Sequence, residues 1–295
     1  MYAIRPATPA EIPQVKALWK KCFRDPAEYI DAFYNSFCTT DQVLVVVEDG
    51  RVRSMASLLP ASIRDTEGEP YPAAYLYALA TDPDFQGHSH ARQLLQAADE
   101  LLVERGYMAM ALVPASPSLH KFFKAVGMDE CFAHRKSEFL ASSLTGKTRN
   151  GTFTPIGPEE YNAIRESYLH GSVHVAYSDD LIRLQELSSR MTGGGLFRVE
   201  VEASDAEVGC AAIEYSNAGT LLIKELLTYH QYTSEAVEMA AKVFPAKRYL
   251  VRTPAAWEGF SGNYIQPFGM VKWYDPVLQR RFDGKQDAYL GLAFD

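Results

Sequence analysis

Residues 79–95 read LATDPDFQGHSHARQLL, and this stretch decides how the first half of the chain folds. The apolar residues at 71–81 predict a strand that leads into it, and regularly spaced leucines after it predict a helix that ends at Gly106. The first N–H groups of a helix have no acceptor within the helix and carry partial positive charge. A tight loop of small residues at this place can therefore hold a pyrophosphate, and we expect that site at Gln86–Ala91.

The rest of the first half alternates strands and helices around this loop. Thr8, Pro9 and Glu11 combine an N-cap hydroxyl, a proline in the first turn and a carboxylate three residues on, which predicts a helix start with a capping box. Apolar spacing predicts the other elements. We expect strands at 2–5, 42–47, 53–63, 71–81, 107–113 and 128–140, and helices at 9–23, 26–37, 92–105 and 116–126.

The second half of the chain begins again in the same way. Residues 141–151 (ASSLTGKTRNG) are small and polar without periodicity, which predicts a linker between two domains, 1–140 and 152–295. The order of elements after the linker repeats the first half and indicates a duplication. We expect helices at 158–169, 179–191 and 234–244, and strands at 196–202, 207–215, 220–227, 248–253, 270–274 and 288–294.

The loop motif resembles the cofactor motif of the GNAT superfamily of N-acetyltransferases. Gln86, Ser89 and Ala91 fall on its three defining positions, although the family normally has glycine where this chain has Ser89. The run 122–128 (FFKAVGM) is similar to a second family motif, and the element order fits as well. The resemblance implies an α/β fold with a mixed sheet, arranged as two tandem acyl-CoA N-acyltransferase domains. The second domain is a degenerate copy, because its matching stretch, 226–234, has no glycine.

The resemblance also implies an acyl-CoA ligand and the residues that bind it. The pantetheine arm would lie beside the strand that ends at Thr81, the pyrophosphate would lie on the loop, and the thioester would lie beside the helix that begins at Ser116. The position of Phe123 is one where many relatives have a tyrosine that protonates the leaving thiolate. The expected cofactor-binding residues are Leu79, Ala80, Thr81, Gln86, Gly87, His88, Ser89, His90, Ala91, Ser116 and Phe123.

Acyl transfer to an amine needs groups that move protons, and four residues are candidates. Tyr75 and Tyr77 share one face of the strand that leads into the loop, where they are either proton-relay groups or packed strand aromatics. His120 lies near the expected thioester, where it is either a proton donor or an exposed helix residue. The tandem layout resembles acetyltransferases of the enhanced-intracellular-survival type, without their third domain. In that group the C-terminal carboxylate is catalytic, which makes Asp295 the fourth candidate.

Composition limits the partners. A net charge of −8 argues against a nucleic acid partner, which requires a concentrated basic face. The four cysteines have no metal-ligand or disulfide spacing, so we expect no metal. Without an apolar run of membrane-spanning length or a signal peptide, the sequence predicts a cytoplasmic protein that is not bound to a membrane. Whether the chain forms a homo-oligomer stays open.

The predicted function is transfer of an acetyl group from acetyl-CoA to a primary amine, by direct attack in a ternary complex. A non-catalytic acyl-CoA-binding or sensing protein is an alternative, favoured by Ser89 and Phe123. An aminoacyltransferase of the peptidoglycan-bridge type is a second alternative, which the charge balance disfavours because its donor is a tRNA. The acceptor stays open among small amines, amino acids, aminoglycoside-like antibiotics and protein N-termini.

Overall fold

The computed structural model describes residues 2–144, 151–202, 208–216, 219–257, 263–282 and 288–294. The chain forms two compact units, each assembled from segments that are distant in the sequence. Unit 1 comprises Met1–Ser62, Tyr71–Asp129 and Met270–Asp283. Unit 2 comprises Ile63–Pro70, Glu130–Gly269 and Gly284–Asp295.

Unit 1 contains a mixed sheet in which the strands follow the order β1-β2-β3-β4-β5-β13. The pairs β1–β2, β2–β3 and β5–β13 are antiparallel, whereas β4–β5 is parallel. The strands are β1 (Tyr2–Pro6), β2 (Val43–Glu48), β3 (Arg51–Arg64), β4 (Pro70–Thr81), β5 (Ala109–Leu112) and the part of β13 (Tyr264–Trp273) from Met270 on. The helices are α1 (Ile12–Phe23), α2 (Ala27–Ala32), α3 (His90–Glu104), α4 (Pro117–Lys124) and α8 (Pro276–Phe282).

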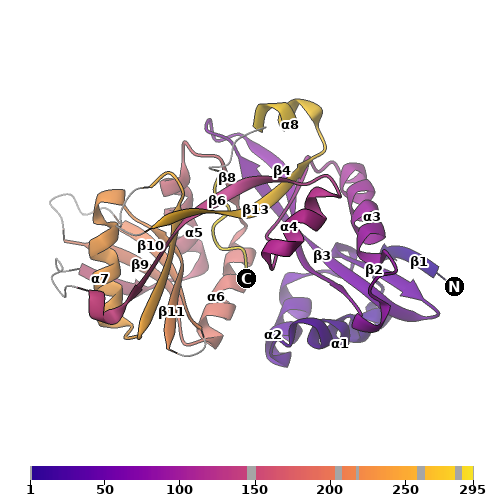
Figure 1. Ribbon diagram of the computed structural model, residues 1–295, viewed down its shortest axis with the longest axis horizontal. Helices are drawn as coiled ribbons and strands as arrows, with labels where there is room; N and C mark the ends of the chain where they lie inside the picture. Colours follow the sequence, from indigo (N-terminus) through magenta and orange to yellow (C-terminus); the bar gives the residue numbers. More distant parts are fainter. Residues whose placement is uncertain are drawn as a thin grey trace. The chain divides into compact units, whose positions relative to one another are not determined.

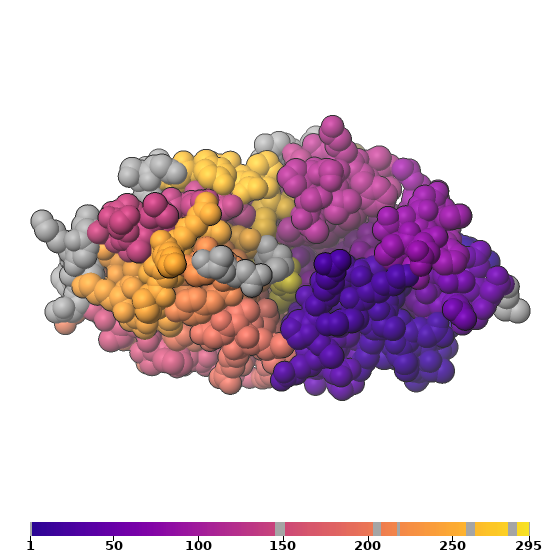
Figure 2. Space-filling model, turned by 60° about the horizontal axis from the view of Figure 1, so that its bottom comes forward, coloured from indigo at the N-terminus to yellow at the C-terminus, as the bar shows by residue number. Residues whose placement is uncertain are grey.

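Helices cover both faces of this sheet. α3 lies on one face, and α1 and α2 lie on the other (Figure 1). The indigo N-terminal residues, which include α1 and α2, form a continuous surface of unit 1 in Figure 2. The buried core on the α3 face includes Leu44, Val46, Leu58, Leu76, Leu94, Leu95, Leu102 and Phe123. The apolar spacing that predicted α3 therefore corresponds to the residues that it buries.

Unit 2 contains a sheet with the same arrangement, in the order β7-β9-β10-β11-β12-β6. Its fourth and fifth strands are again the parallel pair, β11–β12, and its last strand, β6, is antiparallel to β12. Its strands are β6 (Asp129–Leu140), β7 (Gly151–Pro155), β9 (Gly195–Val201), β10 (Val208–Ser216), β11 (Thr220–Leu227) and β12 (Arg248–Pro254), with a short β8 (His174–Ala176). Its helices are α5 (Pro158–Leu169) and α6 (Asp179–Met191) on one face and α7 (Thr233–Val243) on the other (Figure 1).

The compact units differ from the division expected at 141–151. β6, expected to close the first domain, belongs to unit 2 because it pairs with β12 from Arg248↔Leu140 to Pro254↔His134. The sixth place in the sheet of unit 1 is taken by β13, whose end pairs with β5. Residues 145–150 of the expected linker lie outside the described residues. The assignment of 1–140 as an acetyltransferase domain and of 152–295 as its degenerate copy stays a prediction.

Several element predictions need correction. The helix expected at 26–37 ends at Ala32 and continues as a π-helical turn, Phe33–Phe37. The segment 288–294 was expected to be a strand, but only Ala288 and Tyr289 form isolated bridges in it. β8 and α8 were not predicted, because three residues are too few to show a period and α8 is short. By contrast, α5, α6 and β11 have the predicted bounds.

The predicted capping box is present at the start of the first helical segment. Glu11 Oε2 accepts hydrogen bonds from Thr8 N (2.8 Å) and Thr8 Oγ1 (2.9 Å), and Glu11 Oε1 lies 2.8 Å from Arg5 Nη2. The hydrogen bond from Arg5 is the largest cause that lowers the pKa of Glu11 to about 2. This carboxylate therefore joins β1 to the helix that follows it.

We expect Glu11→Gln to lower the free energy of unfolding at pH 7 by about 1 kcal/mol, since part of this pair is exposed to solvent. Because folding lowers the pKa, the stabilisation is present above pH 4.5 and is lost as the pH falls toward 2. Urea unfolding between pH 7 and pH 3 measures it, with Glu67→Gln on an exposed turn as the control. An equal loss for both variants at pH 7 would contradict this account.

Candidate functional site

The edge of β4 opens next to the predicted loop. β4 pairs with β5 only from Ala73↔Ala109 to Tyr75↔Ala111, whereas β4 continues to Thr81. Beyond this ladder Ala78 has φ +52°, a left-handed conformation that is unfavourable for any residue except glycine. The backbone of Leu79–Thr81 therefore lies beyond the ladder with β5, at a strand edge of the kind that pairs with an extended ligand.

The first part of the loop is held in place by charged contacts. Asp82 Oδ1 accepts a hydrogen bond from Asp84 N (3.1 Å) and caps the short 3-10 turn Pro83–Phe85. Lys21 of α1 contacts Asp82 (2.5 Å) and Asp84 (2.9 Å). Burial opposes ionisation of Asp82, but the hydrogen bonds from Lys21 and the Asp84 backbone outweigh it, and the pKa of Asp82 is lowered. The Arg53 guanidinium lies 3.7 Å from the centre of the Phe85 ring, which fixes the middle of the loop.

The second part of the loop turns the backbone into the N-terminus of α3. Gly87 has φ +84°, and Ser89, the N-cap residue of α3, has φ +63°. The glycine that the family has at the position of Ser89 matches this left-handed conformation, which serine adopts at a cost. The Ser89 hydroxyl does not cap the helix. Two left-handed residues beside the free N–H groups of α3 form a concave arrangement of donors that suits an anion.

The loop histidines shape this turn. His88 Nδ1 lies 3.1 Å from the carbonyl oxygen of Phe85 and 3.2 Å from that of Gln86, so Nδ1 carries the proton and donates. The His88 and His90 rings stack with their centres 5.9 Å apart. His90 is buried, whereas Gln86, Gly87, His88 and Ser89 are exposed and accessible to a ligand.

The strand residues expected to bind pantetheine are partly engaged already. Ser54 Oγ donates to the carbonyl oxygen of Ala80 (2.7 Å) and lies 2.9 Å from Thr81 Oγ1. The Cys22 thiol contacts the carbonyl oxygen of Thr81 at 3.6 Å, a weak hydrogen bond that leaves acceptor capacity. Leu79 packs against the core of unit 1.

Tyr75 and Tyr77 lie beside an aromatic cluster between β4 and the first two helices. The hydroxyl groups of Tyr77 and Tyr29 are 2.9 Å apart, and the Trp19 and Tyr77 ring centres are 5.6 Å apart. Burial is the largest cause that raises the pKa of Tyr77 well above its usual value, so its phenol stays neutral and able to donate. Tyr75 is buried, with its ring centre 6.3 Å from that of Tyr77. The structure thus brings Tyr75 and Tyr77 together just before Ala78.

The remaining predicted residues fall in different surroundings. Ser116 precedes α4, where its Oγ lies 2.9 Å from Ser118 Oγ, and His120 of α4 is half-buried. Phe123 is buried in the core of unit 1. Asp295 lies outside the described residues. Within the described ranges no group of three or more His, Cys, Asp and Glu side chains could hold a metal ion, and no helix is long and apolar enough to cross a membrane.

Sequence reasoning missed three features of this site. Ala78 is an ordinary strand residue by type, so nothing in the sequence indicated its left-handed conformation. Lys21 lies about 60 residues from Asp82, and only the fold brings them together. The π-helical turn at 33–37 beside the aromatic cluster had no sequence signal, although such turns often occur at functional sites.

The corresponding stretch of unit 2 has a different backbone. A 3-10 turn, His230–Tyr232, leads directly into α7, and no residue between 226 and 234 has a positive φ. The two left-handed residues that form the anion cradle in unit 1 therefore have no counterpart here.

Comparison with known proteins agrees with this geometry. Residues 3–124 match the family model of the acetyltransferase (GNAT) domain. No curated protein matches the chain. Among solved structures, the chain is similar to a probable N-acyltransferase from Enterococcus faecalis, with 16% identity, 92% of this chain and 73% of that chain covered, and a TM-score of 0.69.

Two further solved structures are similar over nearly the whole chain. A GCN5-related N-acetyltransferase from Anabaena variabilis has 14% identity, covers 93% of this chain and 73% of its own, and gives a TM-score of 0.68. Eis1 from Mycobacterium abscessus has 12% identity, covers 92% of this chain and 74% of its own, and gives a TM-score of 0.64. At these identities the likeness shows the fold, a mixed α/β architecture shared with GNAT acyltransferases. Residues 3–124 thus match the acetyltransferase (GNAT) domain model, and the chain as a whole has the fold of the GNAT acyltransferases.

Proposed function

We propose that this protein is an acyl-CoA-dependent N-acetyltransferase that transfers the acetyl group of acetyl-CoA to a primary amine in a ternary complex. The observation that carries the proposal is the end of β4 beyond its ladder with β5, which runs through Ala78 into the left-handed loop at the start of α3. An extended amide-containing arm fits the first feature, and a pyrophosphate fits the second. Both lie within the residues that match the acetyltransferase family model.

In this proposal the chain binds the cofactor mainly through its backbone. The N–H groups of Gln86–Ala91 would hold the pyrophosphate, and the backbone of Leu79–Thr81 would pair with the pantetheine amides. Ser116, at the start of α4, would lie near the thioester. Lys21 and Arg53 position the loop through Asp82 and Phe85 and do not need to touch the ligand.

The reaction is an acyl transfer. The amine nitrogen attacks the thioester carbonyl carbon, the C–S bond breaks, the nitrogen loses a proton and the leaving thiolate takes one up. Tyr77 is our first candidate for the group that protonates the thiolate, because its phenol stays neutral and is oriented by Tyr29. Tyr75, His120 and the carboxylate of Asp295 are the other candidates for moving protons.

A non-catalytic acyl-CoA-binding protein is the second candidate function. Phe123, at the position where many relatives have a tyrosine acid, is buried in the core and has no proton to give. Under this alternative the loop binds acyl-CoA, and no amine is acetylated. Turnover with any amine separates the two functions.

We expect Gln86→Glu to weaken acetyl-CoA binding at least about tenfold, since it places a negative charge beside the proposed pyrophosphate site. Titration calorimetry with acetyl-CoA measures the effect. Gln279→Glu, the same change on the exposed side of α8, is the control and should bind as the unmodified protein does. Equal affinity of the two variants for acetyl-CoA would contradict the assignment of the pyrophosphate site to this loop.

Ser89→Gly should stabilise the protein by about 0.5–1 kcal/mol, because glycine adopts φ +63° without the steric cost that serine carries. Ser167→Gly, inside α5, should destabilise it by a similar amount. Thermal unfolding of both variants tests the assignment. A fall in Tm for Ser89→Gly would mean that the serine side chain has a stabilising contact.

Tyr77→Phe should lower kcat for amine acetylation about 100-fold with little change in KM for acetyl-CoA, because it removes the proposed acid. Tyr29→Phe removes the other hydroxyl of the same hydrogen bond and should cost only about fivefold. Since the pKa of Tyr77 is raised, its ionisation should not change kcat at any pH below 10. Equal effects of the two variants would reduce Tyr77 to a packing role.

A further inference from the structure

The segment Ala288–Phe294 is buried in unit 2 although it forms no strand or helix of its own. All seven of its residues have less than a tenth of their surface exposed. Its backbone is also strained, since Ala293 and Phe294 both have φ +57°. A segment that is buried in an irregular conformation must be held by groups of the surrounding fold.

Its first two residues are held by main-chain hydrogen bonds. Ala133 N donates to the carbonyl oxygen of Ala288 (3.0 Å), and Val175 N donates to that of Tyr289 (2.9 Å). Tyr289 N donates in turn to the carbonyl oxygen of Val173 (2.8 Å). The segment thus lies against β6 on one side and β8 on the other, in the manner of a peptide added to a sheet edge.

The next residue is held by side chains. The carbonyl oxygen of Leu290 accepts hydrogen bonds from Arg165 Nη2 (3.3 Å) and from the Tyr177 hydroxyl (3.0 Å). Both Arg165 and its ion-pair partner Glu225 are fully buried, with Arg165 Nε 3.1 Å from Glu225 Oε1. Tyr161 donates to the same carboxylate oxygen at 2.7 Å. A buried guanidinium with this many partners is fixed before it meets the carbonyl group.

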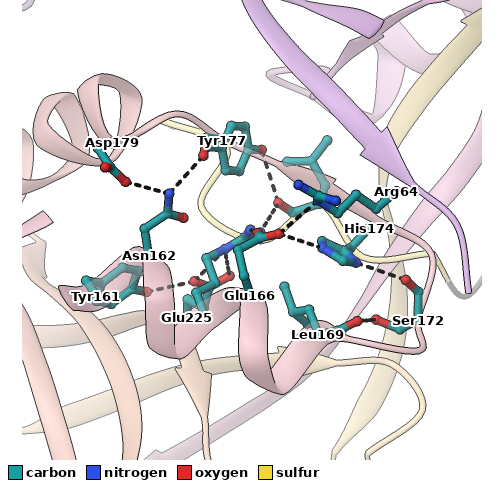
Figure 3. A network of polar contacts seen from close by, with 12 residues as sticks. Arg64, Tyr161, Asn162, Glu166, Leu169, Ser172, His174, Tyr177, Asp179 and Glu225 are labelled. Atoms are coloured by element: carbon teal, nitrogen blue, oxygen red, sulfur yellow. Dashed lines mark hydrogen bonds and ion pairs between the residues drawn. The ribbon is translucent and has the colours of Figure 1, made fainter. Parts of the chain in front are cut away.

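A second set of contacts supports Arg165 from the other side. Glu166 accepts from Arg165 Nη1 (3.0 Å), lies 3.3 Å from Arg64 Nε and lies 3.3 Å from His174 Nε2. Figure 3 shows Glu166 between Arg64 and His174, with Tyr161 and Glu225 at the other end of the network. These Glu166 contacts hold Arg165 through residues outside the segment.

Gly291 restricts which sequences can occupy the place of this segment. It has φ +79°, and a Cβ atom on it would lie 2.2 Å from Glu225 Oε2 and 3.0 Å from Arg165 Nη2. Any other residue would displace the buried ion pair. Leu290 and Leu292 on either side are fully buried. The arrangement therefore selects an apolar-glycine-apolar sequence.

We propose that unit 2 is a receptor for a peptide of this class, occupied by the chain's own segment Ala288–Phe294 and anchored by Arg165 and Tyr177 at the Leu290 carbonyl group. The segment is a separable ligand of unit 2, and the network around Arg165 is its binding site. This proposal does not depend on acyl transfer in unit 1.

The test uses the full chain with a protease recognition sequence inserted between residues 285 and 286. After cleavage, a fluorescent synthetic peptide of residues 286–295 should replace the cut segment, measured by anisotropy and reversed by unlabelled peptide. Loss of the fold on cleavage, or no exchange of the peptide, would overturn the proposal, because the segment would then be inseparable core.

Two matched peptides test the recognition without changing the protein. The Gly291→Ala peptide should bind at least tenfold more weakly, because its Cβ meets Glu225. The Ala293→Gly peptide, the opposite exchange at a left-handed position, should bind as well or better. In the uncut chain Gly291→Ala should lower Tm and Ala293→Gly should not. Equal behaviour of the two exchanges would rule out the proposed site.

Discussion

The proposed site depends on one constraint, the separation of the parallel strands β4 and β5 after Tyr75. A continuous ladder would leave no backbone groups for a ligand, and Ala78 is in the left-handed region where the ladder has ended. The strand then leads into a loop whose own left-handed residues turn it onto the N-terminus of α3. The end of β4 and the helix start thus form one continuous surface of backbone donors and acceptors, in which few side chains are required.

The two units have the same order of strands, but the side chains between the first helix and the fourth strand differ in kind. In unit 1, Trp19 of α1 lies in an aromatic cluster against Tyr77 of β4. In unit 2, Arg165 of α5 forms a buried ion pair with Glu225 of β11. An aromatic surface suits an exchangeable small ligand, whereas a buried charge pair is costly to expose and suits a permanent partner. We therefore infer that the shared strand order serves two kinds of binding.

Local signals in the sequence predicted the elements but not their partners. α5 and α6 have the predicted bounds because Pro158 and Ser178 mark their starts. The exchange of β6 and β13 between sheets was not predictable, since a strand's alternation does not say which strand it joins. The loop was found because glycine and helix-start chemistry leave a local pattern. Ala78 and Arg165 were missed, although the spacing of Arg165 from Tyr161 and Leu169 on a buried helix face was a usable signal.

The most direct test of the central claim is the stoichiometry of acetyl-CoA binding, measured by titration calorimetry on the full chain. In unit 2, β11 also continues past its ladder with β12, but among the described residues only the loop of unit 1 has the left-handed residues, which predicts one acetyl-CoA per chain. Binding of two molecules per chain would show that unit 2 does not need such a loop. No binding at all would contradict the assignment of the β4 edge and the α3 N-terminus as a cofactor site.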